Sequence, residues 1–362
     1  MPSGWLRAVA ADARSVRAVG RAGSPVACPA VTETADTDAR WPGVSVVVPV
    51  LDEEAHLRAA VSTVLGQDYP GDLEVVLALG PSRDRTDEIA AELAAADDRV
   101  RLVPNPSGAT GAGLNLALAA SRHEVVVRLD AHALIPDDYV QVAVETLRRT
   151  GADNVGGLMA AEGVTDFQRA VAAAMTSPFG VGQASFHTGG EEGPALTVYL
   201  GAFRREVLDR LGGYDESFLR AQDWELNHRI RSSGGVVWFT PRLTVSYRPR
   251  SSLRALARQY RDYGRWRRVV MREHEGTASL RYLAPPVAVV VVTVGTVVGL
   301  AGWRPALLAP AAYAAGVIVA SAIAGSGLPP RSRAWLPLVL ATMHGAWGVG
   351  FLTSPRALRA PP

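Results

Sequence analysis

The sequence contains no lysine, so all 37 of its basic residues are arginine. A lysine Schiff base and a phosphate-binding P-loop are therefore both excluded. The only cysteine is Cys28, which excludes a disulfide framework and any zinc site with several thiolate ligands. The first forty residues lack an apolar run as long as that of a signal peptide, and we expect residues 1–40 to form a disordered tail.

Acidic residues are absent from the last 80 residues, Leu283 to the end, which contain five arginines. The segment from Arg242 to Arg281 carries eleven arginines and three acids, and the rest of the chain carries 21 arginines and 32 acids. The near-neutral total thus combines an acidic body, a basic segment and an uncharged tail. This distribution is typical of a soluble domain attached to a membrane, and it does not indicate a nucleic-acid partner.

Three apolar stretches follow the basic segment: Leu283–Ala301, Pro305–Ala324 and Trp335–Leu352. Each is close to the ~20 residues needed to cross a bilayer, so we predict a membrane region over 283–355 with two or three transmembrane helices. The arginine excess before the first stretch predicts that the preceding domain is cytoplasmic. We therefore expect a multi-pass protein of the cell membrane.

The basic segment, residues 248–282, has the pattern of an amphipathic helix at the membrane surface. Leu253, Leu256 and Tyr260 recur at helical spacing with arginines between them. We expect Trp266 at the membrane interface. The alternative is an arginine-rich helix that packs on the acidic body.

The body, residues 41–247, alternates strands with helices. The expected elements are strands Val44–Val50, Leu73–Leu79, Val100–Val103 and Val125–Leu129, with helices Ala55–Leu65, Thr86–Ala96 and Gly111–Ala120 between them. This order predicts an α/β domain with a Rossmann-like, mostly parallel sheet. Ligands of such sheets bind at the carboxyl ends of the strands.

Two polar residues, Asp130 and His132, follow one of these strand ends closely enough to turn toward one ion. A carboxylate with an imidazole suits Mn²⁺ better than Mg²⁺. The alternative for this tripeptide is an ordinary strand-end turn with a solvated carboxylate. Asp223, at the start of another expected helix, is a further polar residue at a candidate site, and its alternative role is to cap that helix.

The order of several motifs resembles the family-2 glycosyltransferases of the GT-A fold. The motifs are Ser45-Val-Val-Val-Pro49-Val-Leu-Asp-Glu-Glu54, Gly111-Ala-Gly-Leu-Asn115, Arg128-Leu-Asp-Ala-His132, Gly201-Ala-Phe-Arg-Arg205, Gly212-Gly-Tyr-Asp-Glu216 and Gln222-Asp-Trp-Glu225. With the apolar stretches behind it, the chain is similar to membrane-bound exopolysaccharide glucosyltransferases of the succinoglycan type.

The resemblance implies a nucleotide-sugar donor, a divalent metal (Mn²⁺ or Mg²⁺) and inversion at the anomeric carbon. Asp130 and His132 match the metal-binding pair, and Asp223 matches the general base. The positions that match donor-binding residues are Pro49, Glu53, Glu54, Gly80, Asp84, Asn115 and Arg229. His187, in a glycine-rich segment, is a further residue that could reach the metal or the phosphates.

One departure from the family concerns recognition of the base. The family has paired aspartates after its second strand, whereas this chain has Leu79 and Gly80 there, and Asp84 matches only a later aspartate. The resemblance therefore leaves the identity of the nucleotide open. It suggests that backbone groups near Gly80 contact the base.

The function predicted on this basis is hexose transfer from a nucleotide-diphosphate sugar to a lipid-linked saccharide in exopolysaccharide or cell-envelope glycan synthesis. The expected partners are the donor, the lipid-linked acceptor, the membrane and other glycan-assembly proteins. Two alternatives stay open at this point. One is a polyprenyl-phosphate sugar transferase, whose acceptor is already ionised and needs no base. The other is a catalytically silent membrane-anchored scaffold.

Overall fold

Strand β1 (Val44–Val50) lies inside the sheet, and every residue of it except Pro49 is buried. Such burial on both faces is typical of a central parallel strand, because helices cover both sides. The computed structural model describes residues 40–182, 184–275, 277–356 and 358, so the expected disordered tail lies almost wholly outside the described residues.

The sheet has the strand order β3-β2-β1-β4-β7-β5-β8-β6. β1 pairs in parallel with β2 (Leu73–Leu79) and β4 (Val125–Arg128), and β2 pairs in parallel with β3 (Val100–Pro104). The second half contains β5 (Asn154–Ala161), β6 (Gly193–Pro194), β7 (Tyr199–Arg204) and β8 (Val237–Tyr247). β7 runs antiparallel to both β4 and β5. The predicted mostly parallel α/β sheet is confirmed, with β7 and the short β6 as its reversed strands.

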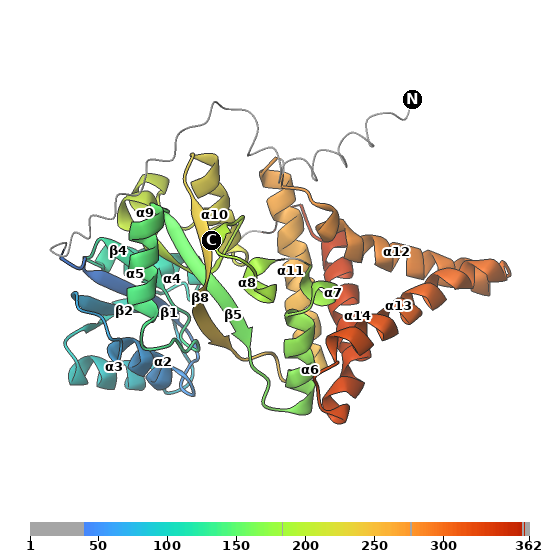
Figure 1. Ribbon diagram of the computed structural model, residues 1–362, viewed down its shortest axis with the longest axis horizontal. Helices are drawn as coiled ribbons and strands as arrows, with labels where there is room; N and C mark the ends of the chain where they lie inside the picture. The colour runs from blue at the N-terminus through green and yellow to red at the C-terminus, as the bar shows by residue number, and fades with distance from the viewer. Residues whose placement is uncertain (1–39, 183, 276, 357, 359–362) are drawn as a thin grey trace. The chain divides into compact units, whose positions relative to one another are not determined.

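Helices cover both faces of the sheet (Figure 1). One face packs against α2 (Leu57–Leu65), α3 (Thr86–Ala96) and α5 (Tyr139–Thr150). The other packs against α4 (Thr110–Ala120), α9 (Arg205–Leu211) and α10 (Gln222–Ser232). The helices cover the two faces of the sheet but not the carboxyl ends of β1, β2 and β4, so polar side chains can collect at these strand ends.

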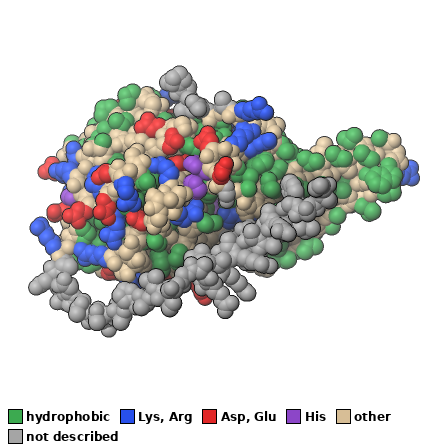
Figure 2. Space-filling model, turned by 90° about the horizontal axis from the view of Figure 1, so that it is seen from above, with side chains coloured by type: hydrophobic (Ala, Val, Ile, Leu, Met, Phe, Trp, Pro, Cys, Tyr) green, Lys and Arg blue, Asp and Glu red, His purple; other side chains and the backbone are tan. Residues whose placement is uncertain are grey.

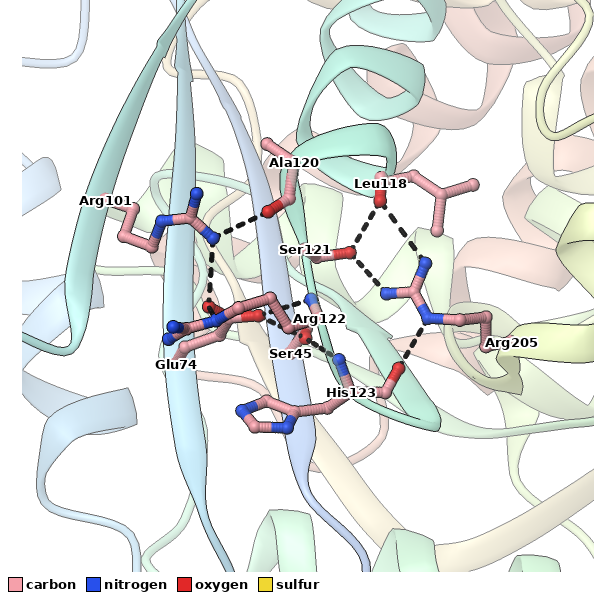
Figure 3. Close-up of polar contacts among 9 residues, drawn as sticks. All are labelled: Ser45, Glu74, Arg101, Leu118, Ala120, Ser121, Arg122, His123 and Arg205. Carbon is pink, nitrogen blue, oxygen red and sulfur yellow. Dashed lines mark hydrogen bonds and ion pairs between the residues drawn. The ribbon is translucent and has the colours of Figure 1, made fainter.

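At the opposite ends of these strands, their amino-terminal ends, a hydrogen-bond network surrounds the buried carboxylate of Glu74 (Figure 3). Glu74 accepts hydrogen bonds from Ser45 Oγ at 2.7 Å and from the backbone N–H of Arg122 at 2.7 Å. Although burial raises the pKa of Glu74, these hydrogen bonds outweigh it and keep the pKa below its usual value. The network ties the connection between α4 and β4 to the two central strands.

The C-terminal region consists of α11 (Leu253–Glu273), α12 (Leu280–Leu300), a 3₁₀ turn η1 (Arg304–Leu307), α13 (Leu308–Ala324) and α14 (Pro330–Leu352). Three helices, α12, η1 with α13, and α14, are long and apolar enough to cross a membrane. Hydrophobic side chains gather over the extension formed by α12 and α13, where Val294, Leu308 and Ile318 are each more than half exposed (Figure 2).

Helix α11 packs between the body and α14 and shares a core with α14 and α6 (Asp166–Met175). Gly264 permits this approach, because a Cβ there would lie 2.1 Å from the Trp347 carbonyl oxygen. Trp266 is only 5 % exposed and contacts the Phe218 ring at a centroid distance of 5.8 Å. The expectation that Trp266 lies at the membrane interface is therefore wrong, because packing against the body buries it.

Candidate active site

The loops that follow β1 and β2 are joined by hydrogen bonds at the carboxyl edge of the sheet. The backbone N–H of Glu53 donates to Thr86 Oγ1 at 2.7 Å, and that of Glu54 donates to Asp84 Oδ2 at 3.1 Å. Hydrogen bonds to Asp84, the strongest from Thr86, lower the pKa of its carboxyl group. Three of the predicted donor-binding residues, Glu53, Glu54 and Asp84, are thus brought together.

Two further predicted donor-binding residues, Pro49 and Gly80, lie at the ends of the same strands. The Gly80 N–H donates to the Val50 carbonyl at 2.8 Å, and a Cβ at Gly80 would lie 3.1 Å from that oxygen. Pro49 is partly exposed near the end of β1. Gly80 is itself buried and its backbone is hydrogen-bonded, so a side chain there would collide with the Val50 carbonyl and Gly108.

His132 lies beside Glu53, with 2.8 Å between His132 Nδ1 and Glu53 Oε1. The hydrogen bond to Glu53 raises the pKa of His132. Asp130 lies two residues earlier, in the turn that ends β4. The structure therefore places the predicted metal-binding pair next to the loop that follows β1.

Arg128, the last residue of β4, is 6 % exposed and lies between two carboxylates. Its Nη2 donates to Asp130 Oδ1 at 3.0 Å, and its Nη1 forms an ion pair with Asp223. Alternation along a strand predicts that positions 128 and 130 share a side, but sequence patterns alone assign Arg128 no role. One buried guanidinium thus holds the predicted base beside a predicted metal ligand.

Asp223 lies in the first turn of α10, two residues after Ala221, which adopts the left-handed conformation at φ 64° before the helix begins. No side chain caps this helix, and Asp223 pairs with Arg128 instead, so the capping alternative fails. Burial raises the pKa of Asp223, while the positive charge of Arg128 lowers it, and burial prevails. With 28 % of its side chain accessible, Asp223 is open to a substrate hydroxyl.

Asn115 and Arg229 both hold the loop that follows α9. Asn115 Nδ2 donates to the Tyr214 carbonyl at 2.9 Å and to Glu216 Oε1 at 2.8 Å. Arg229 donates to the Gly213 carbonyl at 2.8 Å and forms a two-point ion pair with Glu225. The side chains of these two predicted donor-binding residues thus form hydrogen bonds within the protein. They would influence a bound donor by holding the loop after α9 in place and not by direct contact.

Tyrosines form part of the site and were not foreseen from the sequence. Tyr214 is buried, with its ring centroid 5.9 Å from Arg128 Cζ, and burial raises the pKa of its hydroxyl. Tyr199 is partly buried, and burial, with the nearby charge of Asp130, raises its pKa. Single tyrosines carry no spacing signal, so only the fold reveals that they surround these charges.

The donor groups at this edge fit a divalent cation that is shared with a substrate. Among the described residues, no three His, Cys, Asp or Glu side chains are grouped so as to hold a metal by themselves. Mg²⁺ sites that serve phosphate substrates commonly use one or two protein ligands and complete the shell with phosphate oxygens and water. Asp130 and His132 match that arrangement, and the imidazole favours Mn²⁺.

The fold and the polar residues at the carboxyl ends of its strands are typical of nucleotide-sugar transferases of the GT-A type. Comparisons with known proteins support the same class. The pattern described as "Glycosyl transferase family 2" matches residues 45–212. Succinoglycan biosynthesis protein ExoA of Rhizobium meliloti (strain 1021) is 33 % identical over 308 residues, covering 84 % of this chain and 93 % of the relative. The chain belongs to glycosyltransferase family 2 and is an enzyme of that class.

Two further similarities concern a relative and a solved structure. A Methanococcus voltae protein named dolichyl N-acetyl-alpha-D-glucosaminyl phosphate 3-beta-D-2,3-diacetamido-2,3-dideoxy-beta-D-glucuronosyltransferase is 22 % identical over 251 residues, covering 67 % of this chain and 77 % of the relative. Mannosyltransferase PcManGT from Pyrobaculum calidifontis, solved with GDP-Man and Mn²⁺, aligns with a TM-score of 0.56 and 23 % identity, over 87 % of this chain and 88 % of that one. The latter likeness confirms the GT-A fold.

Proposed function

We propose that the protein transfers a hexose from a nucleotide-diphosphate sugar to a lipid-linked saccharide, with inversion, in exopolysaccharide or cell-envelope glycan synthesis. The observation that carries this proposal is the pairing of Arg128 with both Asp130 and Asp223. In this arrangement the proposed base, Asp223, and the proposed metal ligand, Asp130, lie on two sides of one guanidinium. The relatives named for succinoglycan biosynthesis and for a dolichyl-linked sugar support the class of acceptor.

The chemistry follows from the surroundings of Asp223. Its carboxylate accepts the proton of the acceptor hydroxyl as that oxygen attacks the anomeric carbon, and the bond from that carbon to the diphosphate breaks. A positioned base contributes about 10²–10⁴-fold. Arg128 keeps Asp223 oriented and ionised, since its charge opposes the rise in pKa caused by burial. A single displacement of this kind inverts the anomeric carbon.

Asp130 and His132 would hold the divalent metal on the donor diphosphate. A bound metal ion supplies Lewis-acid stabilisation of the charge that develops on the leaving diphosphate. The loops around Glu54 and Asp84 would contact the nucleoside, and backbone groups of residues 81–82, just after Gly80, would replace the aspartates of the family. PcManGT binds GDP-Man with Mn²⁺, which is consistent with donors other than UDP-sugars in this fold.

We further propose that α12 and α13 cross the membrane and that α14 lies along the cytoplasmic body. Near its start, Ser332 Oγ of α14 donates to Asp166 of α6 at 2.7 Å. At its end, the carbonyl of Phe351 accepts from Arg268 of α11 at 2.8 Å. Figure 1 shows α11 and α14 side by side, with α12 and α13 directed away from them.

The charge of α11 explains why α14 would stay out of the hydrocarbon. α11 contains seven arginines, and charged side chains are costly inside a bilayer. A helix that contacts α6 at one end and α11 along its length cannot have its two ends on opposite sides of the membrane. Two crossings also leave Arg331, Arg333 and Arg356 on the side of the catalytic body, in agreement with the positive-inside rule.

The function is tested by a donor screen on the detergent-solubilised full chain with Mn²⁺ and a bacterial lipid extract. We expect one nucleoside diphosphate to be released only when lipid is present. Asp223→Asn should lower that release by at least about 100-fold, whereas Asp209→Asn, which removes an exposed carboxylate, should not. Full activity of Asp223→Asn would favour the polyprenyl-phosphate alternative. Failure of every donor with the folded protein would refute the enzymatic proposal.

A further inference from the structure

A cationic cluster lies where α10, α11 and the start of α12 meet. The guanidinium of Arg267 on α11 lies between two aromatic rings, with its Cζ 4.6 Å from the Trp224 centroid and 4.1 Å from the Tyr282 centroid. Arg281 covers the same Tyr282 ring at 4.6 Å and hydrogen-bonds to its hydroxyl. Helices α10, α11 and α12 thus meet where two arginines contact one tyrosine.

These charges have no acidic counterpart. Within the described part of the chain, neither Arg267 nor Arg281 forms an ion pair with a carboxylate, and Arg267 Nη1 is buried without a hydrogen-bond partner. His187 Nδ1 is also buried and unpartnered, and burial, together with the charge of Arg281, lowers the pKa of His187 to about 4. Arg267 and Arg281 are both partly buried, and a cation withdrawn from water without an anionic partner is costly, so an anionic ligand would relieve that cost.

The position of the cluster limits what the anion can be. Tyr282 belongs to the first turn of α12, the helix that we assign as the first crossing, and its ring stacks on Trp347 at 6.4 Å. Tyrosine and tryptophan of membrane proteins concentrate at the level of the lipid headgroups. The ligand is therefore a headgroup phosphate, and planar guanidinium forks bind phosphate in two-point geometry.

The cluster also adjoins the catalytic carboxylate. Trp224, which stacks on Arg267, directly follows Asp223 on α10. Arg267 therefore contacts the residue next to the proposed base. A saccharide attached to a phosphate at Arg267 would extend past Trp224 toward Asp223.

We propose that Arg267 and Arg281 bind the diphosphate of the acceptor's lipid carrier and thereby present the attached saccharide to Asp223. This inference rests on the proposed function, because it identifies where that acceptor's carrier is held. An ordinary anionic phospholipid has the same phosphate chemistry, so the experiment must separate the two sources.

The test measures the affinity of the full chain in neutral detergent for farnesyl diphosphate, by calorimetry and without donor. We expect farnesyl diphosphate to bind, and Arg267→Gln and Arg281→Gln each to weaken binding by about tenfold or more, since each removes charge-assisted hydrogen bonds. Arg258→Gln is the matched control, because Arg258 is exposed on the same helix about 13.5 Å along its axis. It should leave the affinity unchanged, and farnesol should not bind.

Several outcomes would overturn the assignment. If the wild type and both variants bind farnesyl diphosphate with equal affinity, the assignment of the site to Arg267 and Arg281 is refuted. If equimolar phosphatidylglycerol displaces farnesyl diphosphate, the site binds lipid headgroups in general and not the acceptor's carrier. If Arg267→Gln fails to fold, Arg281→Gln decides, because the half-buried Arg281 hydrogen-bonds only to Tyr282 among the described residues.

Turnover separates this proposal from the proposed function. If the protein turns over no donor but still binds farnesyl diphosphate in an Arg267-dependent way, the proposed function is refuted and the phosphate site is supported. If the Arg267→Gln variant transfers sugar to the lipid extract with an unchanged KM for lipid, the phosphate site is refuted and the proposed function is supported.

Discussion

Arg128 and Asp223 form an ion pair although 95 residues separate them, and that pair joins the end of β4 to the start of α10. The same guanidinium donates to Asp130 at 3.0 Å. Without it, two carboxylates would face each other across the site. The spacing of the proposed base Asp223 and the proposed metal ligand Asp130 therefore depends on one buried arginine.

The first prediction concerns the stability of this pair. Arg128→Met should lower the free energy of unfolding by about 2–3 kcal/mol, somewhat less than for a fully buried pair because both carboxylates are partly exposed. Chemical denaturation measures the change. Adding Asp223→Asn should restore part of the loss, because one of the two unpaired charges disappears. Strictly additive effects of the two substitutions would contradict the direct pairing.

The second prediction concerns pH. The pKa of Asp223 is raised above its ordinary value of 3.8 by burial, and only the ionised carboxylate accepts a proton. The value of kcat/KM should therefore fall as the pH is lowered through that raised pKa, with a midpoint above 3.8. A pH–rate profile measures the limb. An acid limb that persists unchanged in the residual activity of Asp223→Asn would assign it to another group.

The third prediction concerns the metal. His132→Asp replaces the imidazole with a carboxylate and should shift the preference from Mn²⁺ toward Mg²⁺, since Mg²⁺ prefers oxygen ligands. Donor-dependent release of the nucleoside diphosphate, titrated with each metal, measures the shift. His56→Asp changes an exposed histidine near the same loop and serves as the control. An identical shift in both variants would show that overall charge, and not coordination, is responsible.

The fourth prediction concerns the number of membrane crossings. In a Cys28→Ser background, single cysteines at Gly302 and Ser326 should react with an impermeant maleimide from opposite sides of the membrane. A cysteine at Arg356, beyond α14, should react from the same side as Ser326, because α14 follows α11 along the body. Labelling of position 356 from the side of Gly302 would mean that α14 crosses.

The parallel half of the sheet was predictable because its signals are local. The β-branched run Val44–Val50 and the strand Leu73–Leu79 have the bounds that the sequence predicts, as does helix α3. The strands that complete the sheet, such as β7 and β8, were not predicted. Their pairing depends on partners far away in the chain, and β7 runs against its neighbours.

The candidate site divides in the same way. Motif order placed Asp130, His132 and Asp223 on functional elements, and the structure brings the first and third to one arginine. The roles of these residues stay predictions, as does the donor contact of Asn115 and Arg229, whose side chains hold a protein loop here. No periodicity marks Arg128 or Tyr214, because their importance arises from what surrounds them.

The sequence by itself determined the α/β class, the edge at which polar residues collect and the three apolar helices, since hydrophobic periodicity and strand ends are encoded in neighbouring residues. Only the tertiary structure decided that Arg128 joins two carboxylates, that Trp266 is buried and that α14 lies along an arginine-rich helix. These facts depend on contacts between distant segments. Because the chain has no lysine, arginine alone provides these side-chain cations: Arg128 pairs with the proposed base, and Arg267 and Arg281 form the proposed phosphate site.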